Sequence, residues 1–340
     1  MLSCSLTVSQ NAVPEVIRAH IQELFEITID DALKFQRRNC DEPVKTIDIA
    51  LVLALANVFT AMWKDGLKKE TLKMDMPEAQ LKKIVEHFFG FAFVWTVGAS
   101  VSSEAKDKMD TYVMDKVDVL ANLNWVRPGT CFDSYPVIAA DGTIKMHSWN
   151  TIMRPFNYDR NLPFFNLVVP TADTVKHAFL MQKNLEVNQH MFFTGLTGTG
   201  KTVIVSDVLK TLSVSSEEGG MDLMSINLNF SAQTGALSTQ LSIEDKLEKK
   251  RKTLLGPPGA KKIGVVFVDD VNMPEVEEYG AQPPIELLRQ FTEYKGLYDR
   301  QKLFWKDVQS MVTVLAAAPP GGGRAKLTPR FKKLFHVMCV

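Results

Sequence analysis

The stretch Gly195-Leu196-Thr197-Gly198-Thr199-Gly200-Lys201-Thr202 fits the pattern G-x-x-x-x-G-K-[ST] of a phosphate-binding loop. An apolar run precedes it at residues 191–193, and a helical pattern follows it at residues 203–212. Glycines let backbone N–H groups turn inward onto phosphate oxygens, and the N-terminus of the helix adds its dipole. The predicted contacts to a nucleotide are Gly195, Thr197, Gly198, Thr199, Gly200, Lys201 and Thr202.

Two acids at the end of a second apolar run extend this site. Residues 265–268, Val-Val-Phe-Val, predict a buried strand that ends at Asp269 and Asp270. In such sites the Lys neutralises the β- and γ-phosphates, while the Ser/Thr hydroxyl and the strand-end acid hold Mg²⁺. We therefore expect Thr202 and Asp269 to form the metal site. Asp270 stands where a catalytic base orients the attacking water.

Strand and helix patterns alternate from residue 191 onward, which is typical of a parallel α/β sheet. The predicted strands are residues 191–193, 223–229, 265–268 and 312–316, and the predicted helices are 203–212 and 284–294. The first 120 residues instead predict helices at 14–25, 47–63 and 77–101. The chain thus divides into an all-helical part, 1–120, and an α/β part, 121–340.

Composition sets limits on the function. Lys plus Arg and Asp plus Glu both total 39, so the net charge is zero, which argues against a general nucleic-acid or membrane-surface binder. The apolar runs 49–63 and 88–101 are shorter than the roughly 18 residues that span a bilayer, so we expect buried helices. The basic run 244–252 has interleaved acids and no aromatic residues, which favours a solvated helix face over a DNA-binding patch.

Longer strings resemble the third AAA+ module of dynein heavy chains. They are GLTGTGKT (195–202), FVDDVNMPEVEEYGAQPPIELLRQ (267–290), AAAPPGGGR (316–324) and LTPRFKKLFHV (327–337). The DDVNMP wording and the GPPG turn at 256–259 resemble axonemal members of this family. Residues 167–174 resemble the entry to the module, and residues 35–42 and 88–98 resemble the segment that leaves the second module.

The resemblance implies an AAA+ type P-loop NTPase sheet, flanked by helices, after the small helical subdomain of the preceding module. It implies ATP or ADP with Mg²⁺ as cofactors and the neighbouring AAA+ modules of the dynein ring as partners. Dynein intermediate and light chains and microtubules would be reached only through the full heavy chain. The expected location is the cytoplasm and cytoskeleton, in the axoneme of a cilium or flagellum. The chain is expected to be a fragment or short isoform without the module's helical lid.

Two positions depart from the family pattern. Many AAA+ modules carry Glu where this chain has Asp270, and the usual sensor Asn aligns with Ala318. A carboxylate withdrawn by one methylene and a methyl in place of an amide weaken hydrolysis but leave the phosphate loop intact. The resemblance therefore implies a regulatory site that binds ATP and hydrolyses it slowly. Arg330 resembles the finger that serves the preceding module's nucleotide.

Two other functions stay open at this point. A structural spacer would bind nucleotide without turnover, or bind none, and Asp270 with Ala318 are compatible with it. A stand-alone P-loop kinase would carry its own acceptor pocket and lid, and the dynein-like strings cover far more than the phosphate loop. Nucleotide titration of the wild type against Lys201→Ala separates binders from non-binders.

Overall fold

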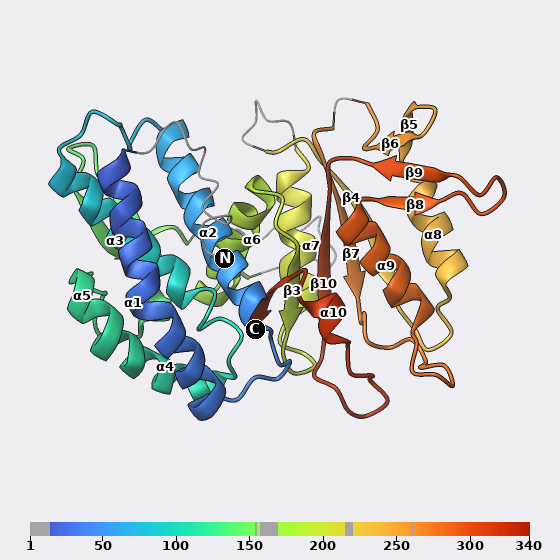
Figure 1. The fold of residues 1–340 in the computed structure, drawn as a ribbon, viewed down its shortest axis with the longest axis horizontal. Coiled ribbons are helices and arrows are strands. Elements are labelled where there is room, and N and C mark those ends of the chain that lie inside the picture. Colours follow the sequence, from blue (N-terminus) through green and yellow to red (C-terminus); the bar gives the residue numbers. More distant parts are fainter. Residues whose placement is uncertain (1–13, 154, 157–168, 215–219, 260) are drawn as a thin grey trace. The chain divides into compact units, whose positions relative to one another are not determined.

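A computed structural model describes residues 14–153, 155–156, 169–214, 220–259 and 261–340. Contacts divide the chain into two compact units. The helical unit runs up to Val187 and includes Cys339, and the sheet unit runs from Asn188 to Met338 and includes Val340. Figure 1 labels helices and strands of both units.

The helical unit is built on long helices with a short hairpin. Its elements are α1 (Glu15–Asn39), α2 (Asp48–Lys68), α3 (Glu78–Val94), α4 (Lys106–Tyr112), α5 (Val119–Ala121), β1 (Ser134–Ile138), β2 (Ile144–Ser148) and α6 (Ala172–Glu186). The strands β1 and β2 pair antiparallel. Short 3₁₀ or π turns lie at Ser103–Ala105, Val113–Asp118, Cys131–Asp133 and Trp149–Thr151. The predicted helix over 77–101 is too long, because α3 ends at Val94 and a buried turn follows.

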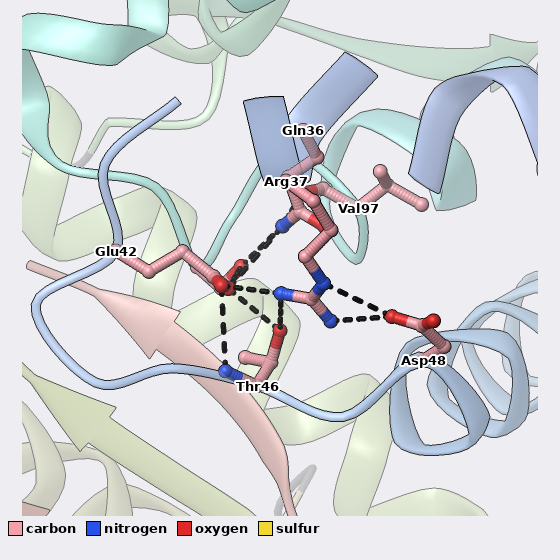
Figure 2. A network of polar contacts seen from close by, with 7 residues as sticks. Gln36, Arg37, Glu42, Thr46, Asp48 and Val97 are labelled. Atoms are coloured by element: carbon pink, nitrogen blue, oxygen red, sulfur yellow. Dashed lines mark hydrogen bonds and ion pairs between the residues drawn. The ribbon is translucent and has the colours of Figure 1, made fainter. Parts of the chain in front are cut away.

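A buried carboxylate holds the start of this unit together (Figure 2). Glu42, whose side chain is only 6% exposed, accepts hydrogen bonds from the Thr46 hydroxyl at 2.6 Å and the Ser100 hydroxyl at 2.8 Å. It also pairs with Arg37 and accepts a bond from Gln36 Nε2 at 3.3 Å. One side chain thus ties the end of α1 to the loop before α2 and to the turn after α3.

The helix α2 is long and apolar enough to cross a membrane by length and composition alone. In this structure 61% of the most apolar 18-residue stretch of α2 is buried, and its neighbours include α3 and α6. Lys183 on α6 pairs with Asp65 on α2 at 2.9 Å. Burial in the helical unit therefore accounts for the apolar run 49–63. The contact division places α6 in this unit, and the predicted boundary near residue 120 stays a prediction.

The sheet unit alternates strands and helices. It contains β3 (Met191–Thr194), α7 (Lys201–Leu212), β4 (Leu223–Asn229), α8 (Ala236–Glu244), β5 (Glu248–Arg251), β6 (Leu254–Gly256), β7 (Ile263–Asp269), α9 (Pro283–Tyr294), β8 (Gly296–Tyr298), β9 (Trp305–Val308), β10 (Met311–Ala317), α10 (Pro329–Lys332) and β11 (His336–Cys339). The main sheet has the order β11-β3-β10-β7-β4, and β3, β10, β7 and β4 run parallel.

Strand register brings the predicted site residues to one edge of the sheet. Thr194, the last residue of β3, lies opposite Ala317 at the end of β10. Asn229 at the end of β4 lies opposite Asp269 at the end of β7. The loops that follow β3, β7 and β10 therefore leave the sheet from the same edge, where open parallel sheets bind ligands. This result confirms the predicted parallel α/β architecture after a helical part.

The prediction for the charged run 244–252 is wrong in its secondary structure. The helix α8 ends at Glu244, and Glu248–Arg251 forms the strand β5, paired antiparallel with β6. Glu248 accepts hydrogen bonds from Lys250 Nζ at 2.8 Å and from the Gly259 backbone N–H at 2.7 Å. Strand pairing and this turn fix the conformation, because a short charged run fits an exposed strand as well as a helix. The side chains are mostly exposed, as expected of a solvated face.

Candidate functional site

The loop at residues 195–200 connects a fully buried strand, β3, to the first turn of α7. Gly195 has φ +150°, and a Cβ there would lie 2.4 Å from the backbone oxygen of Val340. Gly198 and Gly200 have φ of +89° and +86°, which is strained for any residue with a side chain. The backbone conformation of this strand–loop–helix therefore requires glycine at these three positions.

The ammonium group of Lys201 lies inside this loop. Its Nζ donates to the backbone oxygens of Leu196 at 2.7 Å and Gly195 at 3.0 Å, and lies 3.4 Å from Thr199 Oγ1. The side chain is buried, with 8% of the residue exposed. The loop thus holds a positive charge where a phosphate-binding loop needs one.

The next residue, Thr202, reaches across to the end of β7. Its hydroxyl donates a hydrogen bond to Asp269 Oδ2 at 2.6 Å. The other carboxylate oxygen of Asp269 accepts a bond from the backbone N–H of Asp270 at 3.0 Å. The two residues predicted to hold Mg²⁺ are therefore in direct contact. A hydroxyl next to a carboxylate is a donor set that suits this hard cation.

Asp270 has an unusual backbone and a cationic neighbour. Its φ is +50°, a left-handed conformation that few residues with a side chain adopt. Its carboxylate is half exposed, and Oδ1 lies 4.0 Å from Nε of Arg324, which is on the loop after β10. The sequence motif alone assigns no role to Arg324, which is the last residue of the string 316–324.

A third loop residue, Asn272, joins the segments after β7 and β10. Its side-chain Nδ2 donates to the backbone oxygen of Ala318 at 2.9 Å, and its own backbone oxygen accepts from the N–H of Ala325 at 2.9 Å. Asn272 is buried, with 2% exposed. The carboxamide that position 318 lacks is thus present on the neighbouring loop, bonded to Ala318.

Buried polar atoms without a hydrogen-bond partner are a test of whether a ligand fits here. Among the described residues of the sheet unit, these side-chain atoms are Thr194 Oγ1, Asn272 Oδ1 and Arg324 Nε. All three belong to the ends of β3, β7 and β10 or to the loops that follow them. Buried groups of this kind usually have a partner, so their concentration at one edge fits a polar ligand. Together with Lys201 and the Thr202–Asp269 pair, they fit a Mg²⁺-bound phosphate chain.

The structure does not bring every predicted residue together. Arg330 lies on α10 with an exposed side chain, and no hydrogen bond or ion pair joins it to the phosphate loop in the described part of the chain. Thr197 and Thr199 are exposed on the loop, and Ala318 is buried. Arg330 is therefore an exposed residue on the surface of the sheet unit.

Comparison with known proteins identifies the chain's family. The family described as P-loop containing dynein motor region matches residues 156–340, and the dynein heavy chain AAA lid domain matches residues 21–151. The chain belongs to the dynein motor family. The Lys201 loop and the Asp269 strand both lie inside the matched motor region.

The curated relatives of this dynein chain include axonemal heavy chains. It is 38% identical over 326 residues to dynein axonemal heavy chain 6 of Homo sapiens, covering 96% of the chain and 8% of that protein. It is 33% identical to dynein axonemal heavy chain 1 of Homo sapiens and 30% identical to dynein axonemal heavy chain 2 of Mus musculus. In both cases the match covers 94% of this chain, and 8% and 7% of the relatives. This dynein chain thus spans less than a tenth of the length of these three relatives.

Proposed function

We propose that this chain is an ATP-binding regulatory part of an axonemal dynein heavy chain, with Mg-ATP held at the loop 195–202. The observation that carries the proposal is the hydrogen bond from Thr202 to Asp269, together with Lys201 buried in the loop. A cation and a paired hydroxyl–carboxylate already stand at the end of the parallel strands. When bound to Thr202 and Asp269, Mg²⁺ would neutralise the negative charge of the phosphates.

The residues of the chain divide the work of binding. Lys201 would exchange its bonds to the loop carbonyl oxygens for bonds to phosphate oxygens. Thr202 and Asp269 would hold the metal, and the glycines of the loop let its backbone approach the phosphates closely. These roles need little rearrangement, because the groups already lie on neighbouring loops.

Hydrolysis at this site should be slow. Asp270 is the proposed base, and its carboxylate ends one methylene short of the Glu found in many AAA+ modules. A general base contributes roughly 10²–10⁴-fold, and only when it lies within hydrogen-bond reach of its proton. Ala318 has no group that can bond the attacking water. Slow turnover suits a site whose bound nucleotide acts as a signal.

The dynein context extends the proposal to the whole heavy chain. We propose that the helical part is the small subdomain of the second AAA+ module and that the α/β part is the large subdomain of the third. The exposed Arg330 would then serve the nucleotide of the preceding module in the ring. Microtubule-based movement of a cilium or flagellum, and contact with intermediate and light chains, would belong to the full heavy chain.

Nucleotide titration tests the binding proposal. The purified 340-residue chain should bind a fluorescent ATP analogue in the presence of Mg²⁺, and Lys201→Ala should lose most of that binding. Lys210→Ala removes the same charge from an exposed position on the same helix and should bind like the wild type. Equal binding by the Lys201 and Lys210 variants would exclude a phosphate-binding role for the loop.

A structural spacer is the second candidate, favoured by the methyl group of Ala318 at the sensor position. Turnover separates the two functions once binding is established. The regulatory site predicts slow but measurable release of phosphate that disappears in Asp270→Asn. A spacer predicts no release above the level of Lys201→Ala.

A further inference from the structure

The loop after β10 holds Arg324 in a fixed position. The backbones of Gly321 and Arg324 exchange two hydrogen bonds, both at 3.1 Å, which close a tight turn. Asn272 is hydrogen-bonded to both ends of this segment, at Ala318 and at Ala325. The guanidinium therefore stands beside Asp270 because of backbone geometry, and its side chain is only one-quarter exposed.

The position of Arg324 meets an electrostatic need. Asp269 and Asp270 place two carboxylates side by side at the edge where phosphates would bind, and each repels a phosphate anion. Asp269 is bonded to Thr202 and would face Mg²⁺, whereas Asp270 would face the terminal phosphate as the base. Lys201 lies among the loop carbonyl oxygens. Among the described residues, the cation within ion-pair distance of Asp270 is Arg324.

The Arg324 guanidinium also has a hydrogen-bond donor without an acceptor. Its Nε–H is buried and has no hydrogen-bond partner, while the carboxylate beside it is 4.0 Å away, beyond hydrogen-bond length. A buried donor left in this state carries a free-energy cost, so an acceptor is expected to reach it in another state of the site. A slightly displaced Asp270 carboxylate would satisfy it.

We propose that Arg324 is the positioning residue that compensates the charge of Asp270, and that it thereby raises the affinity of the site for ATP relative to ADP. The inference rests on the proposed nucleotide site. Because the terminal phosphate is the group nearest the proposed base, loss of this cation should weaken ATP more than ADP. The effect depends on the charge of Asp270, which distinguishes it from general loss of structure.

The first measurement compares ATP and ADP affinities by titration of the 340-residue chain. Arg324→Ala should lower the ratio of ATP to ADP affinity by about fivefold, the upper range for a partly exposed ion pair. Arg324→Lys, which restores the charge, should recover most of that loss. Lys326→Ala is the matched control, because Lys326 is exposed two residues further along the same loop. It should leave the ratio unchanged.

A double variant provides the decisive test. Asp270→Asn removes the charge that Arg324 compensates, so adding Arg324→Ala to it should change the ATP to ADP ratio little. If Arg324→Ala lowers the ratio equally in the wild-type chain and in the Asp270→Asn variant, the charge-compensation role is excluded. The role is also excluded if the single variant Arg324→Ala has the ATP to ADP affinity ratio and the melting temperature of the wild type. Failure of the wild-type chain to bind either nucleotide would instead overturn the proposed function itself.

Discussion

The hydroxyl of Thr202 and the carboxylate of Asp269 are joined by a 2.6 Å hydrogen bond that connects α7 to the end of β7. The strand β10 separates β3 from β7 in the sheet, so the bond spans the end of an intervening strand. Two residues far apart in sequence thus meet because of strand order. Their contact makes the metal-binding role of each dependent on the other.

Replacing Thr202 should therefore affect binding through Mg²⁺. Thr202→Ala removes the hydroxyl and should abolish most of the gain in ATP affinity that Mg²⁺ gives, whereas Thr202→Ser should keep it. Titration with and without EDTA measures this gain. Thr211→Ala, at an exposed position on the same helix, is the control. An unchanged Mg²⁺ dependence in Thr202→Ala would show that the hydroxyl is not a ligand.

Lengthening the proposed base should accelerate hydrolysis. Asp270→Glu adds one methylene and should raise the single-turnover rate by about tenfold, a fraction of the roughly 10²–10⁴-fold that a well-placed general base contributes. Asp270→Asn should instead remove turnover while keeping nucleotide binding. A rate in Asp270→Glu at or below that of the wild type would mean that reach does not limit the reaction.

A methyl group at Gly195 should destabilise the sheet unit. The Cβ of Gly195→Ala would lie 2.4 Å from the backbone oxygen of Val340, at a φ of +150°. The cost is expected to be about 1–3 kcal/mol, in the range of strain at a special backbone position. Urea unfolding measures it. Gly235→Ala is the comparison, because a Cβ there meets nothing within 4 Å, and its stability should stay near that of the wild type.

The buried Glu42 should be sensitive to loss of charge. Glu42→Gln keeps the shape but removes the charge facing Arg37 and turns an acceptor into a donor opposite the Thr46 and Ser100 hydroxyls. We expect a loss of about 1–3 kcal/mol, because the amide cannot accept from all the buried donors that the carboxylate serves, while Arg37 keeps its ion pair with Asp48. Chemical denaturation followed by circular dichroism checks this. Glu104→Gln, at an exposed site, should change stability little.

Acid should weaken the helical unit through His177. Burial, partly offset by a 2.6 Å bond from Nδ1 to the Asp173 backbone oxygen, lowers the pKa of His177 to about 4 from 6.5. Since the unfolded chain takes up a proton below pH 6.5 and the folded chain does not, stability falls as pH drops from 6.5 towards 4. The loss should reach about 2 kcal/mol at pH 5.

The control for this prediction replaces a different histidine. His177→Asn can place an amide donor at the Nδ1 position facing Asp173 without titrating. It should make the pH dependence of the urea midpoint between pH 7.5 and 5 shallower, while His190, whose pKa burial also lowers to about 4, keeps part of that dependence. His147→Gln, at an exposed position, should leave the slope as it is in the wild type. Identical slopes in both variants would assign the acid sensitivity to other groups.

Sequence patterns predicted the parts of the fold that depend on local periodicity. The predicted strand at 223–229 coincides with β4, and the strand predicted at 265–268 lies within β7. The strand β5 was missed, because four charged residues carry no periodicity and their conformation depends on pairing with β6. The strand conformation of this segment is therefore set by its tertiary pairing, which the local sequence does not encode.

The site divides in the same way. The loop around Lys201 is encoded by a contiguous motif, so its residues could be named from the sequence. The approach of Arg324 to Asp270 and the grip of Asn272 on Ala318 depend on how two loops turn after leaving the sheet. The sequence feature that could indicate Arg324 as a site residue is a glycine-rich loop that follows a strand and ends in Arg. The distance between the loops after β7 and β10 depends on their tertiary conformation, which the sequence pattern does not contain.

The place of β3 in the sheet has a consequence for the order of folding. This strand precedes the others of the main sheet in the sequence, yet its neighbours are β10 and β11, which come last. During synthesis β4 and β7 can pair early, while β3 waits for partners from the far end of the domain, at a high cost in loop-closure entropy. The loop around Lys201 should therefore acquire its native shape late, so that newly made chains become competent to bind nucleotide only when the sheet is nearly complete.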